Sequence, residues 1–222
     1  MGVERLHDMT PTKPSDFIGK AGIIAKVMFH KAESFKSSKL PAIDRRYLLT
    51  GEAGTGKTSL AMALAASITG CTVDNIINRQ ATNVDWLNGQ SCSVEQVRKW
   101  REQGAYLPLY GNRVVQIVDE IDSISPAAAN EILSYLDSLP YHTLLIATTN
   151  KSVSELPDRL QSRFKVHRFT KVETDTISNF LLSHFPKLTN AHKTAQRAEG
   201  NVRAAFTDAL SEMEVQEALA TA

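Results

Sequence analysis

A glycine-rich segment at residues 51–58, Gly-Glu-Ala-Gly-Thr-Gly-Lys-Thr, constrains this chain more than any other feature. It matches the pattern G-x-x-x-x-G-K-[ST], which requires a strand directly before it and a helix directly after it. Residues 46–50 are typical of a buried strand, and residues 59–66 are typical of a helix. The segment therefore predicts a loop that binds a nucleoside triphosphate within a fold of strands and helices.

Each part of this loop has a physical task in binding phosphate. The glycines allow backbone N–H groups to close around the phosphates, and the following helix adds its partial positive charge. Lys57 can reach the β- and γ-phosphates, and Thr58 can ligate Mg²⁺. We expect the whole loop to contact the nucleotide, through Gly51, Glu52, Ala53, Gly54, Thr55, Gly56, Lys57, Thr58 and Ser59.

Composition and charge exclude several other classes of protein. The 222 residues are 42% hydrophobic and 22% charged, which is ordinary for a soluble globular protein. No apolar run approaches the ~18 residues of a membrane span, and the first residues lack a signal-peptide core, so we expect a cytoplasmic protein. The two cysteines and six histidines have no disulfide or metal-ligand spacing. A net charge of +1 confines any nucleic-acid binding to a local patch or to several subunits together.

Strand and helix patterns alternate as far as about residue 170. The predicted strands are 46–50, 72–78, 114–118, 143–149 and 166–169, and the predicted helices between them include 18–35, 93–103 and 126–137. This alternation predicts an α/β fold with a five-stranded parallel sheet covered on both faces. The remaining predicted helices are 173–184, 189–199 and 201–219. We therefore expect an N-terminal arm (1–15), a nucleotide-binding core (16–170) and a small helical lid (171–222).

Polar side chains follow two of the predicted strands. The carboxyl ends of parallel strands meet at one edge of a sheet, so Asp119, Glu120 and Asn150 are expected beside the phosphate loop. Asp119 would hold Mg²⁺ directly or through its water, and Glu120 would act as the general base that polarises the attacking water. Asn150 would orient that water or contact the γ-phosphate, although it is also a common turn former. Asp122 is assigned a supporting role.

Taken together, these motifs resemble those of the AAA+ ATPases over residues 16 to about 213. The matching segments are 16–20, the Walker A loop 51–58, Walker B at 114–120, sensor 1 at Asn150, Leu-Gln-Ser-Arg-Phe at 160–164 and Gly-Asn-Val-Arg at 200–203. The resemblance implies a P-loop core with a helical lid that binds ATP and Mg²⁺, with Phe17 and Ile18 on the adenine side. It also implies a homo- or hetero-oligomeric ring.

In such a ring, the resemblance assigns two further roles in hydrolysis. Arg163 would be an arginine finger that acts at the nucleotide of a neighbouring subunit, with Arg159 as a second candidate. Arg203, on the lid, would contact the γ-phosphate of its own subunit. Hydrolysis at subunit interfaces would then depend on assembly, because a finger supplies a factor of about 10³–10⁵ in rate.

Residues 119–169 resemble the clamp-loader clade, including the small subunits of replication factor C and the bacterial clamp loader. This implies a DNA-bound motor in replication, recombination or repair, similar to a clamp loader or helicase loader, with a replication or recombination protein as its partner. Arg98 is then a candidate contact to DNA phosphates, with Lys99 and Arg101 as weaker candidates. A solvated helix face is the alternative. Because the sequence reaches residue 222 directly after the lid, we expect no clamp-loader collar.

Two other interpretations remain open. Trp86-Leu87-Asn88-Gly89 follows the predicted second strand, where protein-remodelling AAA+ members carry a pore loop, so Trp86 would grip a threaded polypeptide. Trp86 would alternatively stack on a base, or be buried for structural reasons. A scaffold that assembles on ATP with little turnover is the second interpretation. A small-molecule kinase is disfavoured, because it would not need Asn150, Arg163 and Arg203 together.

Overall fold

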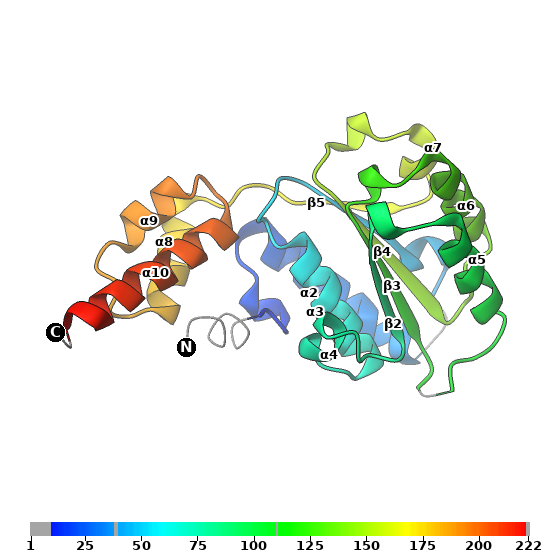
Figure 1. Ribbon diagram of the computed structural model, residues 1–222, viewed down its shortest axis with the longest axis horizontal. Helices are drawn as coiled ribbons and strands as arrows, with labels where there is room; N and C mark the ends of the chain where they lie inside the picture. The colour runs from blue at the N-terminus through cyan, green and yellow to red at the C-terminus, as the bar shows by residue number, and fades with distance from the viewer. Residues whose placement is uncertain (1–9, 38–39, 110, 221–222) are drawn as a thin grey trace.

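Five parallel strands form one sheet between two layers of helices, in the spatial order β2-β3-β4-β1-β5 (Figure 1). This computed structural model describes residues 10–37, 40–109 and 111–220, so residues 1–9 of the predicted arm and 221–222 of the predicted lid lie outside it. The strands are β1 (Arg46–Thr50), β2 (Val84–Asn88), β3 (Val114–Asp119), β4 (Thr143–Thr149) and β5 (Lys165–Arg168). The predicted five-stranded parallel sheet is confirmed.

Helices cover both faces of this sheet (Figure 1). One layer contains α2 (Gly19–Ser37), α3 (Lys57–Thr69) and α4 (Val73–Ile77), and the other contains α5 (Val94–Gln103), α6 (Pro126–Asp137) and α7 (Asp158–Gln161). Neighbouring strand residues pack against opposite layers. Leu49 and Ile117 pack with buried side chains of the α2–α4 layer, whereas Leu48 and Val118 pack with those of the α5–α7 layer. This alternation is expected of strands that are buried on both faces.

A helical unit follows β5 and lies at the end of the molecule away from the sheet, at the left in Figure 1. It consists of α8 (Thr174–His184), α9 (Ala191–Arg197) and α10 (Val202–Ala220), around a core that includes Ile177, Leu181 and Ala209. The three predicted lid helices are confirmed, whereas the boundary at residue 171 stays a prediction. Within the described ranges, no helix combines the length and the apolar character that crossing a membrane requires.

The second strand was predicted at the wrong place. Residues Val73–Ile77 form α4, because Thr72 and Asn75 cap its first turn. The Asn75 N–H donates to Thr72 Oγ1 at 3.1 Å, and the Thr72 N–H donates to Asn75 Oδ1 at 3.2 Å. This local pairing favours a helix over the β-forming tendency of the sequence. The second strand is instead β2, a half-buried edge strand that contains Trp86.

Candidate nucleotide-binding site

The loop between β1 and α3 has the backbone that close approach to phosphate requires. Gly51, Gly54 and Gly56 have φ angles of 139°, 74° and 95°, in the region that favours glycine. At Gly54, an added Cβ would lie 1.8 Å from Oδ1 of Asn201, so the lid leaves no room for a side chain there. Helix α3 begins at Lys57, and the unpaired N–H groups of its first turn therefore lie at this loop.

Lys57 is buried at the start of α3, with 6% of its surface exposed. Its ammonium group donates to the carbonyl oxygens of Gly51 and Glu52, both at 2.7 Å. Burial lowers the pKa of Lys57 to about 8, and the negative charge of Asp119 is the largest opposing influence. The loop thus holds a cation whose two carbonyl partners would be replaced by phosphate oxygens when a triphosphate binds.

Asp119, the last residue of β3, accepts two hydroxyl hydrogen bonds. Thr58 Oγ1 donates to Asp119 Oδ1 at 2.8 Å, and Thr148 Oγ1 donates to the same oxygen. Hydroxyl and carboxylate oxygens are ligands that Mg²⁺ prefers, so Thr58 and Asp119 fit the predicted metal. Thr148 was not predicted as a site residue. Its signal in the sequence is a hydroxyl near the end of a strand, two residues before Asn150.

Glu120 follows β3 in a left-handed backbone conformation, with φ of 56°. Its N–H donates to Thr148 Oγ1 at 3.1 Å, and its Oε2 accepts from Asn88 Nδ2 at 3.1 Å. Asn88 ends β2 and lies in register with Asp119, which explains the contact. Asn88 was missed as a site residue because the second strand was misplaced. A left-handed conformation is costly for a glutamate and is typical of functional sites.

A cavity of about 400 Å³ brings most of the predicted phosphate-side residues together. Its lining includes Lys57, Thr58, Asp119, Glu120, Asn150 and Arg203. Asn150 lies exposed just after β4, and Arg203 lies in the first turn of α10, where its N–H donates to Gly54 O at 3.4 Å. Core and lid therefore meet at the phosphate loop. Asp122 instead accepts a hydrogen bond from Thr149 Oγ1 at 2.6 Å, consistent with a supporting role.

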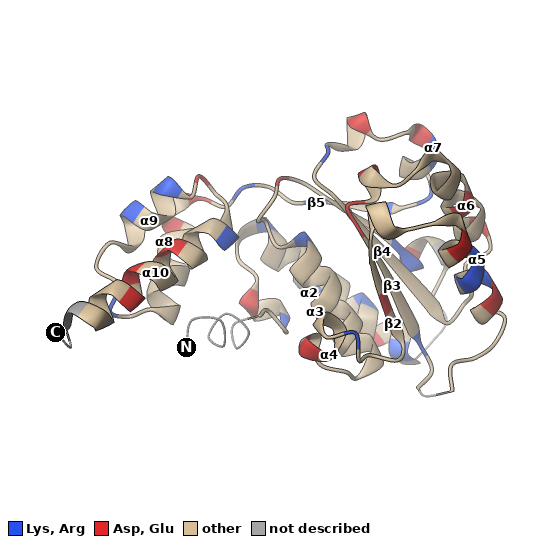
Figure 2. Ribbon diagram, viewed as in Figure 1, with Lys and Arg blue, Asp and Glu red and all other residues tan. Residues whose placement is uncertain are grey.

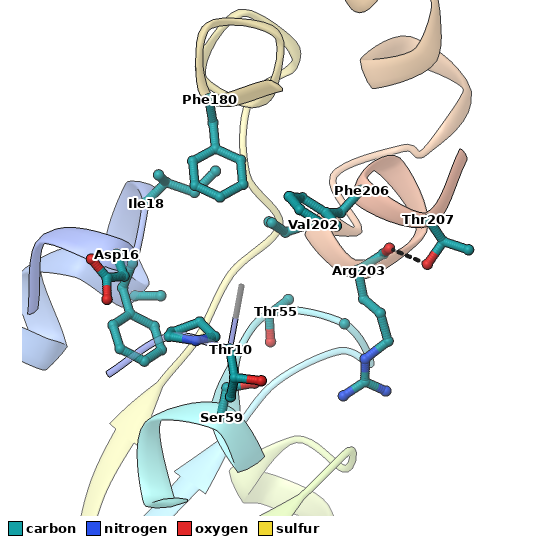
Figure 3. Close-up of a pocket in the computed structure, with 15 residues that line it drawn as sticks. Thr10, Asp16, Ile18, Thr55, Ser59, Phe180, Val202, Arg203, Phe206 and Thr207 are labelled. Atoms are coloured by element: carbon teal, nitrogen blue, oxygen red, sulfur yellow. Dashed lines mark hydrogen bonds between the residues drawn. The ribbon is translucent and has the colours of Figure 1, made fainter. Parts of the chain in front are cut away.

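A second cavity of about 240 Å³ lies between the loop, the N-terminal segment and the lid (Figure 3). Phe17 and Ile18 line it, together with Phe180 of α8 and Phe206 of α10. Aromatic and apolar walls suit the flat face of a nucleotide base. Phe17 and Ile18 were predicted on the adenine side. The two lid phenylalanines were missed, because their position depends on how the lid packs against the core.

Arg163 contributes to neither of these cavities in the described part of the chain. Arg163 lies in the turn between α7 and β5, and its Nε and Nη2 donate to the carboxylate of Asp137, the last residue of α6, both at 2.9 Å. Its Nη1 donates to Arg159 O at 3.1 Å, and Arg159 Nη1 donates to Asn130 Oδ1 at 2.9 Å. The structure does not bring Arg163 to the nucleotide site of its own subunit, and its role as a finger stays a prediction.

The predicted DNA contacts lie on α5 and β2. Figure 2 shows basic and acidic residues side by side on α5 and α6. Arg98 Nε is 3.8 Å from Glu131, Arg101 Nη1 is 2.8 Å from the same carboxylate, and Lys99 is exposed. The charge of Arg98 and Arg101 is therefore partly balanced. Contacts of Arg98, Lys99 and Trp86 with DNA stay predictions.

The predicted pore-loop position of Trp86 is wrong. Trp86 lies within β2 rather than in a loop after the second strand. Its side chain packs against the buried side chains of the α2–α4 layer. The Arg79 guanidinium lies 4.9 Å from the centre of its ring. The indole also lines the phosphate-side cavity, next to Glu120. Half-buried and covered by Arg79, this side chain is not placed to grip a threaded polypeptide.

Comparison with known proteins relates the chain to replication proteins. Its residues 47–172 match the sequence model of the "ATPase family associated with various cellular activities (AAA)". DNA polymerase III subunit gamma of Buchnera aphidicola subsp. Baizongia pistaciae is 26% identical over 220 residues, covering 89% of this chain and 56% of the relative. DNA polymerase III subunit tau of Escherichia coli K12 is 30% identical over 194 residues, covering 78% and 29%. The chain thus spans about half or less of these relatives.

Solved structures show the same fold. A mutant form of RuvB from Thermotoga maritima superposes with a TM-score of 0.69 at 19% identity, covering 90% of this chain and 64% of that one. A DNA polymerase III gamma subunit-related protein from Thermotoga maritima gives a TM-score of 0.52 at 17% identity, covering 78% and 57%. The resemblance predicted from the motifs is confirmed: the chain belongs to the AAA family of ATPases and is similar to the gamma and tau subunits of DNA polymerase III.

Proposed function

We propose that this chain hydrolyses ATP with Mg²⁺ at an interface between subunits, as a DNA-bound motor similar to a clamp loader or helicase loader. The convergence of Lys57, Asp119, Glu120, Asn150 and Arg203 on one cavity carries the proposal. The similarity to DNA polymerase III gamma and tau supports a role in DNA replication or recombination, with a protein of those processes as partner.

In hydrolysis, a water oxygen attacks the γ-phosphorus, the bond from that phosphorus to the β–γ bridging oxygen breaks so that ADP leaves, and a base accepts the proton of the water. Glu120 would accept that proton, and its carboxylate would first have to leave the Asn88 amide that now holds it. Asn150 would orient the water, while Lys57 and Arg203 would balance the charge that develops on the γ-phosphate. Mg²⁺ bound by Thr58 and Asp119 would neutralise negative charge on the phosphates.

The exposure of the two residues that would hold the attacking water supports the proposed subunit interface. Glu120 and Asn150 are both exposed, so this side of the site opens to the surface of the subunit. A neighbouring subunit could therefore add a cation beside the attacking water. Arg163, which lies outside its own nucleotide cavities, is the proposed donor, and Arg159 is the second candidate.

The proposal predicts that DNA stimulates ATP hydrolysis. The experiment measures steady-state ATP turnover without DNA and with single-stranded, double-stranded or primed DNA, at two salt concentrations. Stimulation should weaken at the higher salt, because phosphate contacts release counterions. The Glu120→Gln variant should bind ATP but lose turnover, whereas Lys57→Ala should lose both. Turnover that no DNA changes would contradict the proposed DNA-bound role.

Subunit mixing tests whether Arg163 acts on a neighbouring subunit. Arg163→Ala subunits keep an intact loop, and Lys57→Ala subunits keep an intact finger, so each variant alone should be inactive. A mixed assembly creates sites that combine one intact loop with one intact finger, and part of the activity should return. Failure to recover activity, in mixtures shown to form mixed oligomers, would refute a finger in trans.

A scaffold that binds ATP with little turnover is the second candidate. The contact from Asn88 Nδ2 to Glu120 favours it, because it occupies the carboxylate that would act as the base. Under this alternative, Glu120→Gln leaves the slow basal rate unchanged, while ATP still drives assembly of the wild-type chain. A sharp loss of turnover in Glu120→Gln would support the motor instead.

A further inference from the structure

The ion pair between Arg163 and Asp137 has a defined two-point geometry. Arg163 Nε and Nη2 each donate to a different oxygen of the Asp137 carboxylate, at 2.9 Å. The third nitrogen, Nη1, donates to Arg159 O at 3.1 Å. Asp137 is the last residue of α6, so the carboxylate is carried by a helix packed on the sheet. Bidentate pairs of this kind fix both the position and the plane of a guanidinium.

This pairing leaves donors on Arg163 for a further partner. A guanidinium has five N–H donors. Three of them account for the contacts with Asp137 and Arg159, and the part of the chain that is described supplies no hydrogen bond for the other two, one on each terminal nitrogen. Arg163 also remains 32% exposed, so these donors are within reach of a neighbouring molecule. Arg163 can therefore contact phosphate oxygens without leaving Asp137.

An arginine without such a partner would have to be ordered when the subunits meet. The rotamer freedom of a long arginine side chain corresponds to a factor of up to about 30 in an equilibrium or rate constant. The Asp137 carboxylate stays charged, because hydrogen bonds from Arg163 hold its pKa below the usual range. A partner that orders Arg163 in the isolated subunit removes most of this cost before assembly.

We propose that Asp137 is a positioning residue that presets the Arg163 guanidinium for delivery to the nucleotide of a neighbouring subunit. The inference rests on the proposed function, in which Arg163 is the finger. Asp137 touches neither nucleotide nor water in this scheme, and it acts only through Arg163. The opposite arrangement, in which Asp137 withholds Arg163 from the neighbour, predicts the opposite change in rate.

The experiment compares DNA-stimulated ATP turnover of the full chain in five variants. They are Arg163→Ala, Asp137→Ala, the double variant, Asp137→Glu and the control Glu33→Ala. Glu33 forms an exposed ion pair with Lys36 on α2, at 2.6 Å, and its loss should not change turnover. We expect Asp137→Ala to lower kcat about 10- to 30-fold with little change in KM. Asp137→Glu should restore most of the rate, because it keeps the carboxylate.

Two further readouts separate positioning from a general structural effect. If Asp137 acts only through Arg163, the double variant should be no slower than Arg163→Ala. Mixing Asp137→Ala subunits with Lys57→Ala subunits should restore activity, because the mixture again pairs an intact loop with a preset finger. Thermal unfolding of Asp137→Ala should stay close to that of Glu33→Ala, since both residues are exposed.

The outcomes distinguish the positioning role of Asp137 from the proposed finger role of Arg163. An Arg163→Ala variant with normal turnover would refute the finger, and the inference would fail with it. A slow Arg163→Ala together with an unchanged or faster Asp137→Ala would leave the finger in place and overturn only the positioning role. The positioning role would also be overturned if the double variant lost clearly more turnover than Arg163→Ala alone. It would likewise be overturned if mixing Asp137→Ala with Lys57→Ala subunits restored no activity.

Discussion

Replacing Thr148 with valine removes one hydroxyl group at nearly constant volume. Thr148 is 1% exposed, and its Oγ1 donates to Asp119 Oδ1 and accepts from the Glu120 N–H at 3.1 Å. A hydrogen bond to a charged group contributes about 1.5–3 kcal/mol, and an unsatisfied buried donor costs about 1–3 kcal/mol. Because the cavity admits water beside Glu120, part of this loss is replaced. We expect Thr148→Val to lower the free energy of unfolding by about 2–4 kcal/mol.

Urea unfolding followed by circular dichroism measures this loss. With a slope of about 1–3 kcal/mol per molar urea, the midpoint should fall by about 1 M or more. ATP turnover should also fall at least about 10-fold, because Asp119 and Glu120 each lose one of the hydrogen-bond partners that position them. Thr149→Val is the matched control: its Oγ1 donates to Asp122 Oδ1 at 2.6 Å, so it should lose similar stability while keeping turnover.

Two results would refute this reasoning. An unchanged urea midpoint in Thr148→Val would mean that water replaces both hydrogen bonds, so the energies worked out above would be too large. Equal losses of turnover in Thr148→Val and Thr149→Val would mean that the rate reports general stability. In that case, the contact of Thr148 with Asp119 has no specific role in the site.

Three further predictions concern residues that line the phosphate-side cavity or contact its lining. Asn88→Ala should raise ATP turnover without DNA, because it frees the Glu120 carboxylate, and a fall in that rate would contradict a restraining role. ATP affinity, measured by calorimetry, should weaken as pH rises through about 8, where Lys57 loses its proton; Lys57→Arg should abolish this dependence. Gly54→Ala should weaken ATP binding through its collision with Asn201, and Asn201→Gly should restore part of it; no recovery would place the defect in the loop backbone.

The residues at the centre of the site could be predicted from the sequence, because each group of them is contiguous in the chain. Residues 51–58 define a strand, a loop and a helix by themselves, and the run 114–120 carries both carboxylates at the end of one strand. Once the strands are parallel, their ends meet at one edge, so the approach of Asp119 to Thr58 follows from topology.

Asn88 shows where the same reasoning fails. Its strand has few of the residues that favour strands, since Asp85 and Asn88 both disfavour them, and pairing with β3 determines its structure. Residues 72–78 have stronger β-formers, yet a capping pair makes them helical. Pairing with a neighbouring strand determines the structure of residues 84–88, and local capping determines that of residues 72–78. An argument from residue propensities alone misses both effects.

Contacts between segments that are distant in the chain could not be predicted from the sequence either. Phe180 and Phe206 reach the base-side cavity only because the lid packs against the N-terminal segment. Asp137 and Arg163 are 26 residues apart, and no motif links them, so their pairing depends on how α6 lies beside the turn before β5. Side chains that meet through packing of separate elements leave no periodic signal in the chain.

The position of α10 gives the lid a mechanical property. The helix has 19 residues, so at a rise of about 1.5 Å per residue it is a rod of about 28 Å. Its first turn contacts the phosphate loop through the Arg203 N–H, while its other end lies far from the sheet (Figure 1). A tilt of about 10° at the loop would move the far end by about 5 Å. Were the lid to tilt as a unit about this contact, a small change at residues 51–58 would become a displacement of several ångströms at the far end of α10.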